Sequence, residues 1–164
     1  DMASRMCTKL INKSVNMRPN LNNLSGEKEA LSLLELNTCI RGALSRAFPE
    51  TCWVRAEMSD VRVNTSSGHC YLEFVEKNVQ TGQLVAKVRG SIWAKTFRML
   101  KPYFEMETGQ MFASGLKVLV KVSVEFHELY GLSLTVLDID PAYTLGDMVR
   151  KLSLIHISEP TRPY

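Results

Sequence analysis

The sequence predicts a mainly β protein, a five-stranded barrel with flanking helices. Five segments between residues 53 and 140 alternate apolar and polar residues with a period of two, which is typical of half-buried strands. Apolar residues recur at helical spacing in two other segments, one before the first strand and one between the third and fourth. The 164 residues are 45% hydrophobic, which is enough apolar material for one globular core.

We expect three parts along the chain. Residues 1–30 lack sustained periodicity and should form a disordered lead-in. Residues 31–143 should form the barrel domain, and residues 144–164 the start of a linker helix followed by a non-native tail. Residues 152–164 do not continue a helical pattern, contain two prolines and resemble translated adapter sequence. Because the chain begins with Asp1, we expect a fragment of a longer protein.

The first helix is predicted to begin after Ser32 and to end before Pro49. Ser32 and Glu35 have the spacing of a capping box, in which each side chain bonds to the backbone of the other. The positions that follow give the helix one apolar face, formed by Leu33, Leu36, Ile40, Leu44 and Ala47. We expect this helix to close one end of the barrel.

The first three strands are separated by two turns, the first at residues 66–68 and the second within the polar segment 76–83. Because side chains alternate between the two faces of a strand, the pattern assigns each residue a side. The inward residues are Val54, Ala56 and Met58, then Cys70, Leu72 and Phe74, then Leu84, Ala86 and Val88. The outward residues are Arg55, Glu57 and Ser59, then His69, Tyr71 and Glu73, then Lys87 and Arg89.

A second helix is predicted from the spacing of Trp93, Phe97, Leu100 and Phe104, with Pro102 ending regular helix near that point. Residues 105–115 should form a loop. Trp53 and Trp93 begin elements beside apolar residues, so both are expected to pack in the core, with stacking on a base as the alternative. The fourth strand is predicted over residues 117–126 and the fifth from Leu132 to near Pro141; Thr144 with Asp147 then indicates another helix start.

Three strands, a helix and two more strands follow one another in the order of an OB-fold, a partly open five-stranded barrel. The predicted fold is therefore an OB-fold with an N-terminal helix and a helix between strands 3 and 4. A five-stranded SH3-like barrel is the alternative, but it does not usually carry a helix at that position. In an OB-fold, the exposed face of strands 2 and 3 is the usual ligand surface.

Aromatic and cationic residues on this face form a candidate nucleic-acid site, which consists of Arg55, His69, Tyr71, Lys87 and Arg89. A flat ring can stack on a base, and cations can contact phosphates. A solvated sheet face with one amphipathic tyrosine is the alternative interpretation. Bulk charge does not decide between them, because residues 51–140 hold ten Lys and Arg against ten Asp and Glu. Lys95, Arg98 and Lys101 are expected to form the solvated face of the second helix.

Nothing in the sequence specifies catalysis, a metal or a cofactor, because no hydrolase, phosphate-loop or metal-binding motif occurs. Glu57 and Glu73 are expected to be exposed charges partnered by Arg55 or Lys87. The four cysteines show no metal spacing and are expected to be reduced thiols in a cytoplasmic protein. No apolar run reaches membrane-spanning length, and the amino terminus lacks a signal-peptide core.

Three motifs together resemble the amino-terminal domain of the large subunit of bacterial exodeoxyribonuclease VII. They are Trp53-Val-Arg-Ala-Glu-Met-Ser59, Ser66-Ser-Gly-His-Cys-Tyr71 and Lys117-Val-Leu-Val-Lys121, and Leu36-Asn37 and Arg89-Gly90 also fit. The resemblance covers residues 31–148. The sequence departs from the usual pattern at Ala56, where glycine is common, and in a longer loop at residues 101–115.

The resemblance implies a single-stranded DNA-binding OB-fold domain of an enzyme that degrades single-stranded DNA to oligonucleotides. In that family a central domain carries the nuclease, and a long helical region binds the small subunit. Neither region is matched here, so the chain is expected to be inactive alone, with no catalytic residue of its own. The alternative is a stand-alone OB-fold module that binds a protein or a transfer RNA.

Overall fold

The structure is a computed structural model that describes residue 28 and residues 30–157. This part of the chain divides into two compact units. The helical unit contains helix α2, Leu33–Ala47, and residues 125–131, which form the turn between the last two strands together with the strand ends beside it. The barrel unit contains residues 50–124 and the chain from residue 132 onward.

Helix α2 spans Leu33–Ala47 and begins with the predicted capping box. The Ser32 hydroxyl accepts a hydrogen bond from the Glu35 N–H at 3.1 Å, and the Ser32 N–H donates to the Glu35 carboxylate at 2.9 Å. The predicted end before Pro49 is also confirmed. None of the α2 residues is buried or belongs to the barrel core. That this helix closes one end of the barrel stays a prediction. The helical side chains in the core are those of helix α3, Ala94–Thr108.

Within the helical unit, α2 is held to the turn at residues 125–131. The Asn37 side-chain amide donates to the Glu128 carbonyl at 2.8 Å, and Arg41 forms a 3.0 Å ion pair with the Glu128 carboxylate. Cys39 on the same helix is disulfide-bonded, so the prediction of reduced cysteines is wrong for Cys39. The prediction is confirmed for Cys52 and Cys70, which are free.

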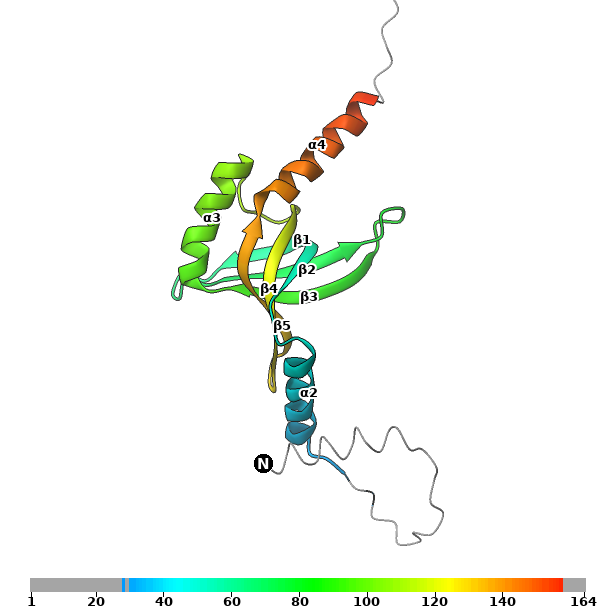
Figure 1. Cartoon of the computed structure of the whole chain (residues 1–164), viewed down its shortest axis with the longest axis vertical. Coiled ribbons are helices and arrows are strands. Elements are labelled where there is room, and N and C mark those ends of the chain that lie inside the picture. Colours follow the sequence, from blue (N-terminus) through cyan, green and yellow to red (C-terminus); the bar gives the residue numbers. More distant parts are fainter. Residues whose placement is uncertain (1–27, 29, 158–164) are drawn as a thin grey trace, which may run out of the picture. The chain divides into compact units, whose positions relative to one another are not determined.

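Five strands form a closed barrel in the order β1-β2-β3-β5-β4, which confirms the predicted fold class (Figure 1). The strands span Cys52–Val63, Cys70–Lys77, Leu84–Ile92, Lys117–His127 and Gly131–Asp140. Strand β1 pairs antiparallel with both β2 and β4, whereas β3 and β5 run parallel. Figure 1 shows α3 beside one end of the barrel and the β2–β3 hairpin extending away from it.

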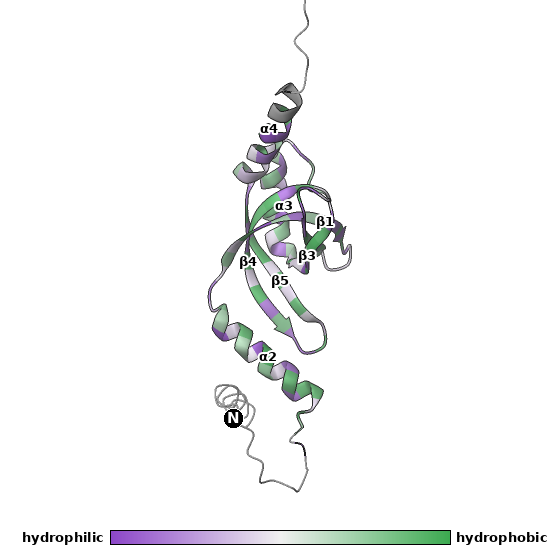
Figure 2. Ribbon diagram, turned by 90° about the vertical axis from the view of Figure 1, so that its right-hand side faces the viewer, coloured by the Kyte–Doolittle hydropathy of each residue, from purple (hydrophilic) through white to green (hydrophobic). Residues whose placement is uncertain are grey.

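The inner face of the strands forms the core largely as the alternation predicts. Val118, Val120 and Val122 on β4 are at most 2% exposed, as are Met58 and Cys70. Figure 2 shows the same alternation of hydrophobic and hydrophilic residues along β4 and β5. The core is completed by Leu72, Phe74, Ile92, Phe97, Leu100, Phe104, Phe112, Leu134, Val136 and Ile139.

The start of β3 departs from the predicted pattern. Leu84 is 57% exposed and Ala86 is also exposed, although both have the inward parity. The reason is that β5 pairs with β3 only from Arg89 to Ser91, so the earlier part of the strand pairs with β2 alone and lies in the extended hairpin. Alternation predicts which face a residue occupies, but not whether anything covers that face.

Helix α3 spans Ala94–Thr108, well beyond the predicted end near Pro102. Proline removes one backbone donor and strains the turn before it. Burial of Phe104, which is 0% exposed, and of Thr108 on the same face outweighs that cost. The helix ends at Gly109, whose φ of 66° is accessible to glycine at little cost.

Helix α4 spans Pro141–Ile157. It begins before the predicted start at Thr144 and runs beyond residue 152, so the prediction that the helical pattern stops there is wrong. The Thr144 hydroxyl donates to the Lys117 carbonyl at 2.8 Å and ties the first turn to β4. Of the expected lead-in at residues 1–30, residues 1–27 and 29 lie outside the described residues, and so does the end of the tail at residues 158–164.

Candidate nucleic-acid interface

Two hairpin turns of the barrel are built in the same way, and the first of them positions a candidate residue. In each turn the side-chain oxygen of an asparagine accepts two hydrogen bonds, from the backbone N–H groups of the residues two and three positions later. A glycine with positive φ closes the turn. These turns are Asn64–Gly68 and Asn78–Gly82. A Cβ at Gly68 would lie 3.2 Å from the Cβ of Ala94, so glycine also lets the first turn approach α3.

His69 follows this turn and lies against the start of α3. Its Nδ1 accepts a hydrogen bond from the Ala94 N–H at 2.8 Å. The N-cap residue Trp93 makes no side-chain cap bond, so His69 satisfies this donor from outside the helix. With Nδ1 accepting, hydrogen-bond geometry assigns the imidazole proton to Nε2. His69 is half-buried, and the prediction that it faces outward is therefore only partly correct.

Three rings meet beside this contact, and we name His69, Tyr71 and Trp93 the aromatic corner. The His69 ring packs edge-on against Trp93, with centroids 5.0 Å apart, and against Tyr71 at 6.4 Å. Tyr71 is 47% exposed and Trp93 is 57% exposed, so both present ring surface to water. The prediction that Trp93 packs in the core is wrong, because the residue precedes the first buried turn of α3 rather than belonging to it.

Two arginines flank the aromatic corner. Arg62 lies directly opposite Tyr71 in the β1–β2 ladder, and its Nε is 2.8 Å from the Asp60 carboxylate. Sequence reasoning missed Arg62, because a bulge between Ser59 and Arg62 shifts the register of β1. Asp60, within that bulge, has a φ of 48°. Arg89 lies opposite Glu73, two residue pairs along the β2–β3 ladder from the pair of Tyr71 and Ser91.

The two cations predicted on β3 differ in their surroundings. Lys87 forms a 3.1 Å ion pair with Glu73, which offsets much of its charge. Arg89 is exposed and forms no ion pair within the part of the chain that the structure describes. Arg89 is therefore better placed than Lys87 to attract an anion.

Arg55 does not join the other predicted residues. It lies on β1 seven residues before Arg62, which corresponds to roughly 23 Å along the strand at about 3.3 Å per residue. It is opposite Leu119 of β4 rather than beside β2 and β3. Facing the same way along a strand is thus not enough to place Arg55 near Tyr71.

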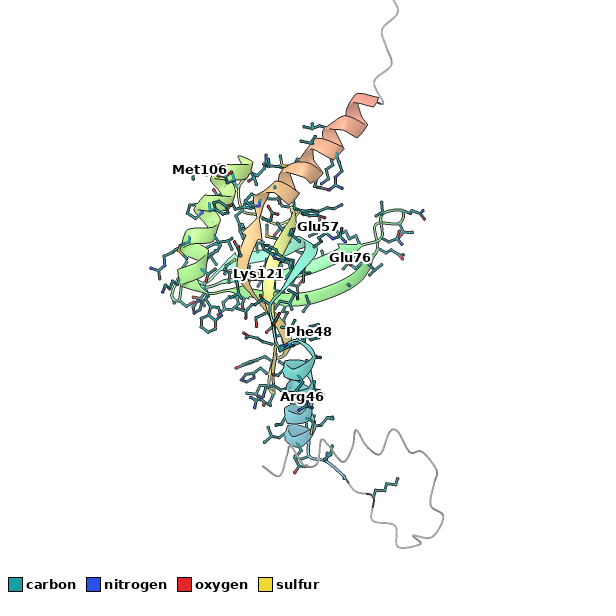
Figure 3. The ribbon with its side chains drawn as sticks, in the orientation of Figure 1. Arg46, Phe48, Glu57, Glu76, Met106 and Lys121 are labelled. Carbon is teal, nitrogen blue, oxygen red and sulfur yellow. The ribbon has the colours of Figure 1, made fainter. Side chains whose placement is uncertain are left out.

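Acidic residues occupy the part of the sheet toward the β2–β3 hairpin, where Figure 3 labels Glu57 and Glu76. Glu57 pairs with Lys77 at 3.2 Å, not with Arg55 as predicted, because β2 brings Lys77 beside it. The predicted pairing of Glu73 with Lys87 is confirmed. Free positive charge on this face therefore lies away from the hairpin, around Arg89.

The described residues contain no group of three or more histidine, cysteine, aspartate or glutamate side chains able to hold a metal ion. Burial raises the pKa of the Cys70 thiol to about 11, against a smaller opposing effect of Lys101, so this thiol is not a ready nucleophile. What the aromatic corner can do is bind, through exposed rings and cations. No helix in the same part of the chain is long and apolar enough to cross a membrane.

Comparison with known proteins agrees with the motifs. Residues 31–140 match the family described as OB-fold nucleic acid binding domain. The chain is 38% identical over 130 residues to the exodeoxyribonuclease 7 large subunit of Deinococcus radiodurans, which confirms the resemblance seen in the sequence. That match covers 76% of this chain but only 30% of the relative's length.

Two solved structures resemble part of this chain. A small single-stranded DNA binding protein from Mycoplasma pneumoniae has a TM-score of 0.36 at 4% identity, over 55% of this chain and 90% of its own. The SSB domain of a Synechococcus protein has a TM-score of 0.34 at 13% identity, over 54% of this chain and 91% of its own.

Proposed function

Because this chain belongs to the family of OB-fold nucleic acid binding domains, we propose that its barrel unit binds single-stranded DNA at the aromatic corner. The observation that carries this proposal is the exposure of Tyr71 and Trp93 beside the exposed Arg89, with Arg62, which is paired with Asp60, opposite Tyr71. Exposed rings beside cations are the usual means of holding a single strand without reading its sequence.

The corner favours a single strand over a duplex for a geometric reason. Tyr71 and Trp93 are both about half exposed, so each can offer ring surface to an unpaired base. In a duplex the base faces are covered by their neighbours, and only phosphates remain as contacts for the cations, chiefly Arg89. Stacking on an aromatic side chain is worth about 1–3 kcal/mol per base and tolerates any base. We therefore expect weak sequence selectivity.

This proposal narrows the set of DNA-binding residues predicted from the sequence. That set was Arg55, His69, Tyr71, Lys87 and Arg89. Tyr71 and Arg89 are the direct contacts, and His69 contributes its ring edge while holding the corner against α3. Lys87 contributes less because Glu73 pairs with it. Arg55 lies outside the corner.

We further propose that the chain acts as the DNA-binding part of an exodeoxyribonuclease VII large subunit in the cytoplasm. The support is the match to the Deinococcus radiodurans protein, whose name describes that subunit. Degradation of single-stranded DNA and binding of a small subunit would then belong to the part of that protein that this chain does not span.

Fluorescence anisotropy with a labelled 20-nucleotide single strand, the matching duplex and a transfer RNA tests the proposal. The protein should bind single-stranded DNA much more tightly than the duplex. Its affinity for the single strand should fall steeply as the salt concentration rises. Equal affinity for duplex would contradict stacking as the basis of binding. A clear preference for transfer RNA would assign the domain to the alternative class of OB-fold module.

A further inference from the structure

The outer face of β1 and β4 carries a second group of aromatic and cationic side chains, separate from the aromatic corner. In the ladder between these strands, Lys121 lies opposite Trp53, and the next outward pair is Leu119 opposite Arg55. Figure 3 labels Lys121 on β4. We name Trp53, Arg55 and Lys121 the β1–β4 patch.

Trp53 is not in this position to fill the core. It is 49% exposed, although the sequence predicted a buried residue. The residues on either side of it, Cys52 and Val54, point inward and pack against the core, together with Val120 and Val122 of β4. The inner face is thus filled without Trp53, and a large ring is left on the water side of the barrel, where a bound partner could cover it.

The charge of the patch is uncompensated. Arg55 is exposed and Lys121 is half-buried, and neither forms an ion pair with any residue that the structure describes. The next outward pair along the same ladder is different, because Lys117 is 3.9 Å from Asp147 and Glu57 pairs with Lys77. Two free cations beside one exposed indole match a polyanion that carries aromatic groups, which is the chemistry of a nucleic-acid strand.

We propose that the β1–β4 patch is a second contact for the same single strand that binds at the aromatic corner. In this proposal Trp53 stacks on a base, and Arg55 and Lys121 contact phosphates. The proposal rests on the proposed function, because it needs a strand already held at the corner. It gives the strand a path along β1, from Arg62 beside the corner to Arg55 and Trp53, past Glu57, whose carboxylate is paired with Lys77.

The length of this path sets how many nucleotides it needs. Arg55 and Arg62 are separated by roughly 23 Å of strand at about 3.3 Å per residue. A strand with the rise of stacked B-form DNA advances about 3.4 Å per nucleotide, so about seven nucleotides are needed to reach from one group to the other. A tetranucleotide should therefore occupy the corner alone, and an oligonucleotide of 15 residues should occupy both groups.

Affinities for dT4 and dT15 in the full chain test this dependence on length. For dT15, Lys121→Gln and Arg55→Gln should each lower affinity about fivefold at 0.1 M salt, the loss that one phosphate contact with a salt slope of about 0.7 predicts. For dT4 the same variants should bind like the parent. Arg150→Gln on α4 is the matched charge control, because Arg150 is exposed and forms no ion pair with the described residues, and it should change neither affinity.

Tryptophan fluorescence gives a second readout, because Trp53 and Trp93 are the two tryptophans of the chain. In Trp93→Phe, Trp53 is the sole indole, and dT15 but not dT4 should quench it. In Trp53→Phe, both oligonucleotides should quench Trp93. A quench of Trp53 that depends on length cannot arise from a general loss of charge or from unfolding.

The outcomes separate the two proposals. If Tyr71→Ala weakens dT15 binding while Trp53 stays unquenched and the Lys121 and Arg55 variants match the parent, the β1–β4 contact is overturned and the aromatic corner stands. If those two variants weaken dT4 as much as dT15, the effect is general charge loss, and the contact is again overturned. If the parent binds neither oligonucleotide, the proposed function fails and this inference fails with it.

Discussion

The imidazole Nδ1 of His69 accepts a 2.8 Å hydrogen bond from the backbone N–H of Ala94, which begins α3. This bond joins the end of the first hairpin turn to a helix 25 residues later. The same ring contacts Tyr71 and Trp93, so one side chain holds the helix start and the exposed rings in a fixed relation.

Replacing His69 should separate these two roles. His69→Ala leaves the Ala94 N–H without its acceptor and should lower the free energy of unfolding by about 1 kcal/mol, as loss of a helix cap usually does. His69→Asn offers a side-chain oxygen near the same place and should recover much of that stability without restoring the ring. Urea unfolding measures the first effect and DNA affinity the second. A His69→Ala protein as stable as the parent would show that the cap contributes nothing.

Tyr71→Ala should weaken binding of single-stranded DNA by about 1–3 kcal/mol, because it removes a stacking surface. Arg89→Ala should weaken binding evenly across sequences and lower the salt slope by about 0.7, the value for one phosphate contact to a single strand. Fluorescence anisotropy over a salt series measures both, with a thermal melt to confirm folding.

Lys95→Ala on α3 is the control for these two variants and should have little effect, because Lys95 lies on the exposed side of the helix. If Tyr71→Ala and Arg89→Ala bind like the parent while Lys95→Ala does not, the strand path follows α3 and the aromatic corner is the wrong site.

Gly90→Ala should destabilise the barrel by about 1–3 kcal/mol through overpacking. A Cβ at this position would lie 2.4 Å from Cε2 of Phe74, whose ring is 2% exposed and cannot move aside freely. Gly146→Ala on α4 meets nothing within 4 Å and should instead stabilise the protein by several tenths of a kcal/mol. Thermal melts compare the two; a second change, Phe74→Leu, should recover part of the loss in the Gly90 variant.

The Cys70 thiol should resist alkylation in the native protein at pH 8, whereas Cys52, which is half-buried, should react. Burial raises the Cys70 pKa from 9.0 to about 11, with Lys101 acting in the opposite direction. The folded protein therefore keeps a proton that the unfolded chain releases above pH 9, so this contribution to stability is present below pH 9 and lost as pH rises toward 11. Urea midpoints from pH 8 to 11 should fall less steeply for Cys70→Val than for the parent.

Purified protein should not hydrolyse labelled single-stranded DNA, with or without divalent metal, because the described residues contain no acid–base or metal constellation. Glu57 and Glu73 are each engaged by a lysine. Cleavage that survives purification and disappears in Glu57→Gln or Glu73→Gln would refute the assignment of this chain to binding alone.

The alternation of apolar and polar residues predicted the barrel and its inner face well. A strand with one buried side must place an apolar residue at every second position. Val118, Val120 and Val122 could be assigned with no other information. The capping box at Ser32 is equally local. Pro102 shows the limit of local rules, since the burial of Phe104 that keeps α3 intact past the proline depends on the rest of the core.

The candidate site was predictable by residue type but not by position. Arg55 and Tyr71 have the same outward parity, yet the bulge at Asp60 and the pairing of β1 with β4 place them far apart along the sheet. Arg62 enters the site through that same bulge. The bond from His69 to Ala94 joins two segments whose contact is visible only once the barrel closes.

The parallel ladder between β3 and β5 closes the barrel through only three register pairs, centred on Gly90 opposite Leu134. The hairpin of β2 and β3 has eight. The two strands of the short ladder are separated in sequence by α3 and β4, so the ladder can form only after a long loop has been ordered. Opening this seam would expose the core while the β2–β3 hairpin remained paired. Amide hydrogens of the β3–β5 ladder should therefore exchange with solvent through partial unfolding, before the whole domain melts.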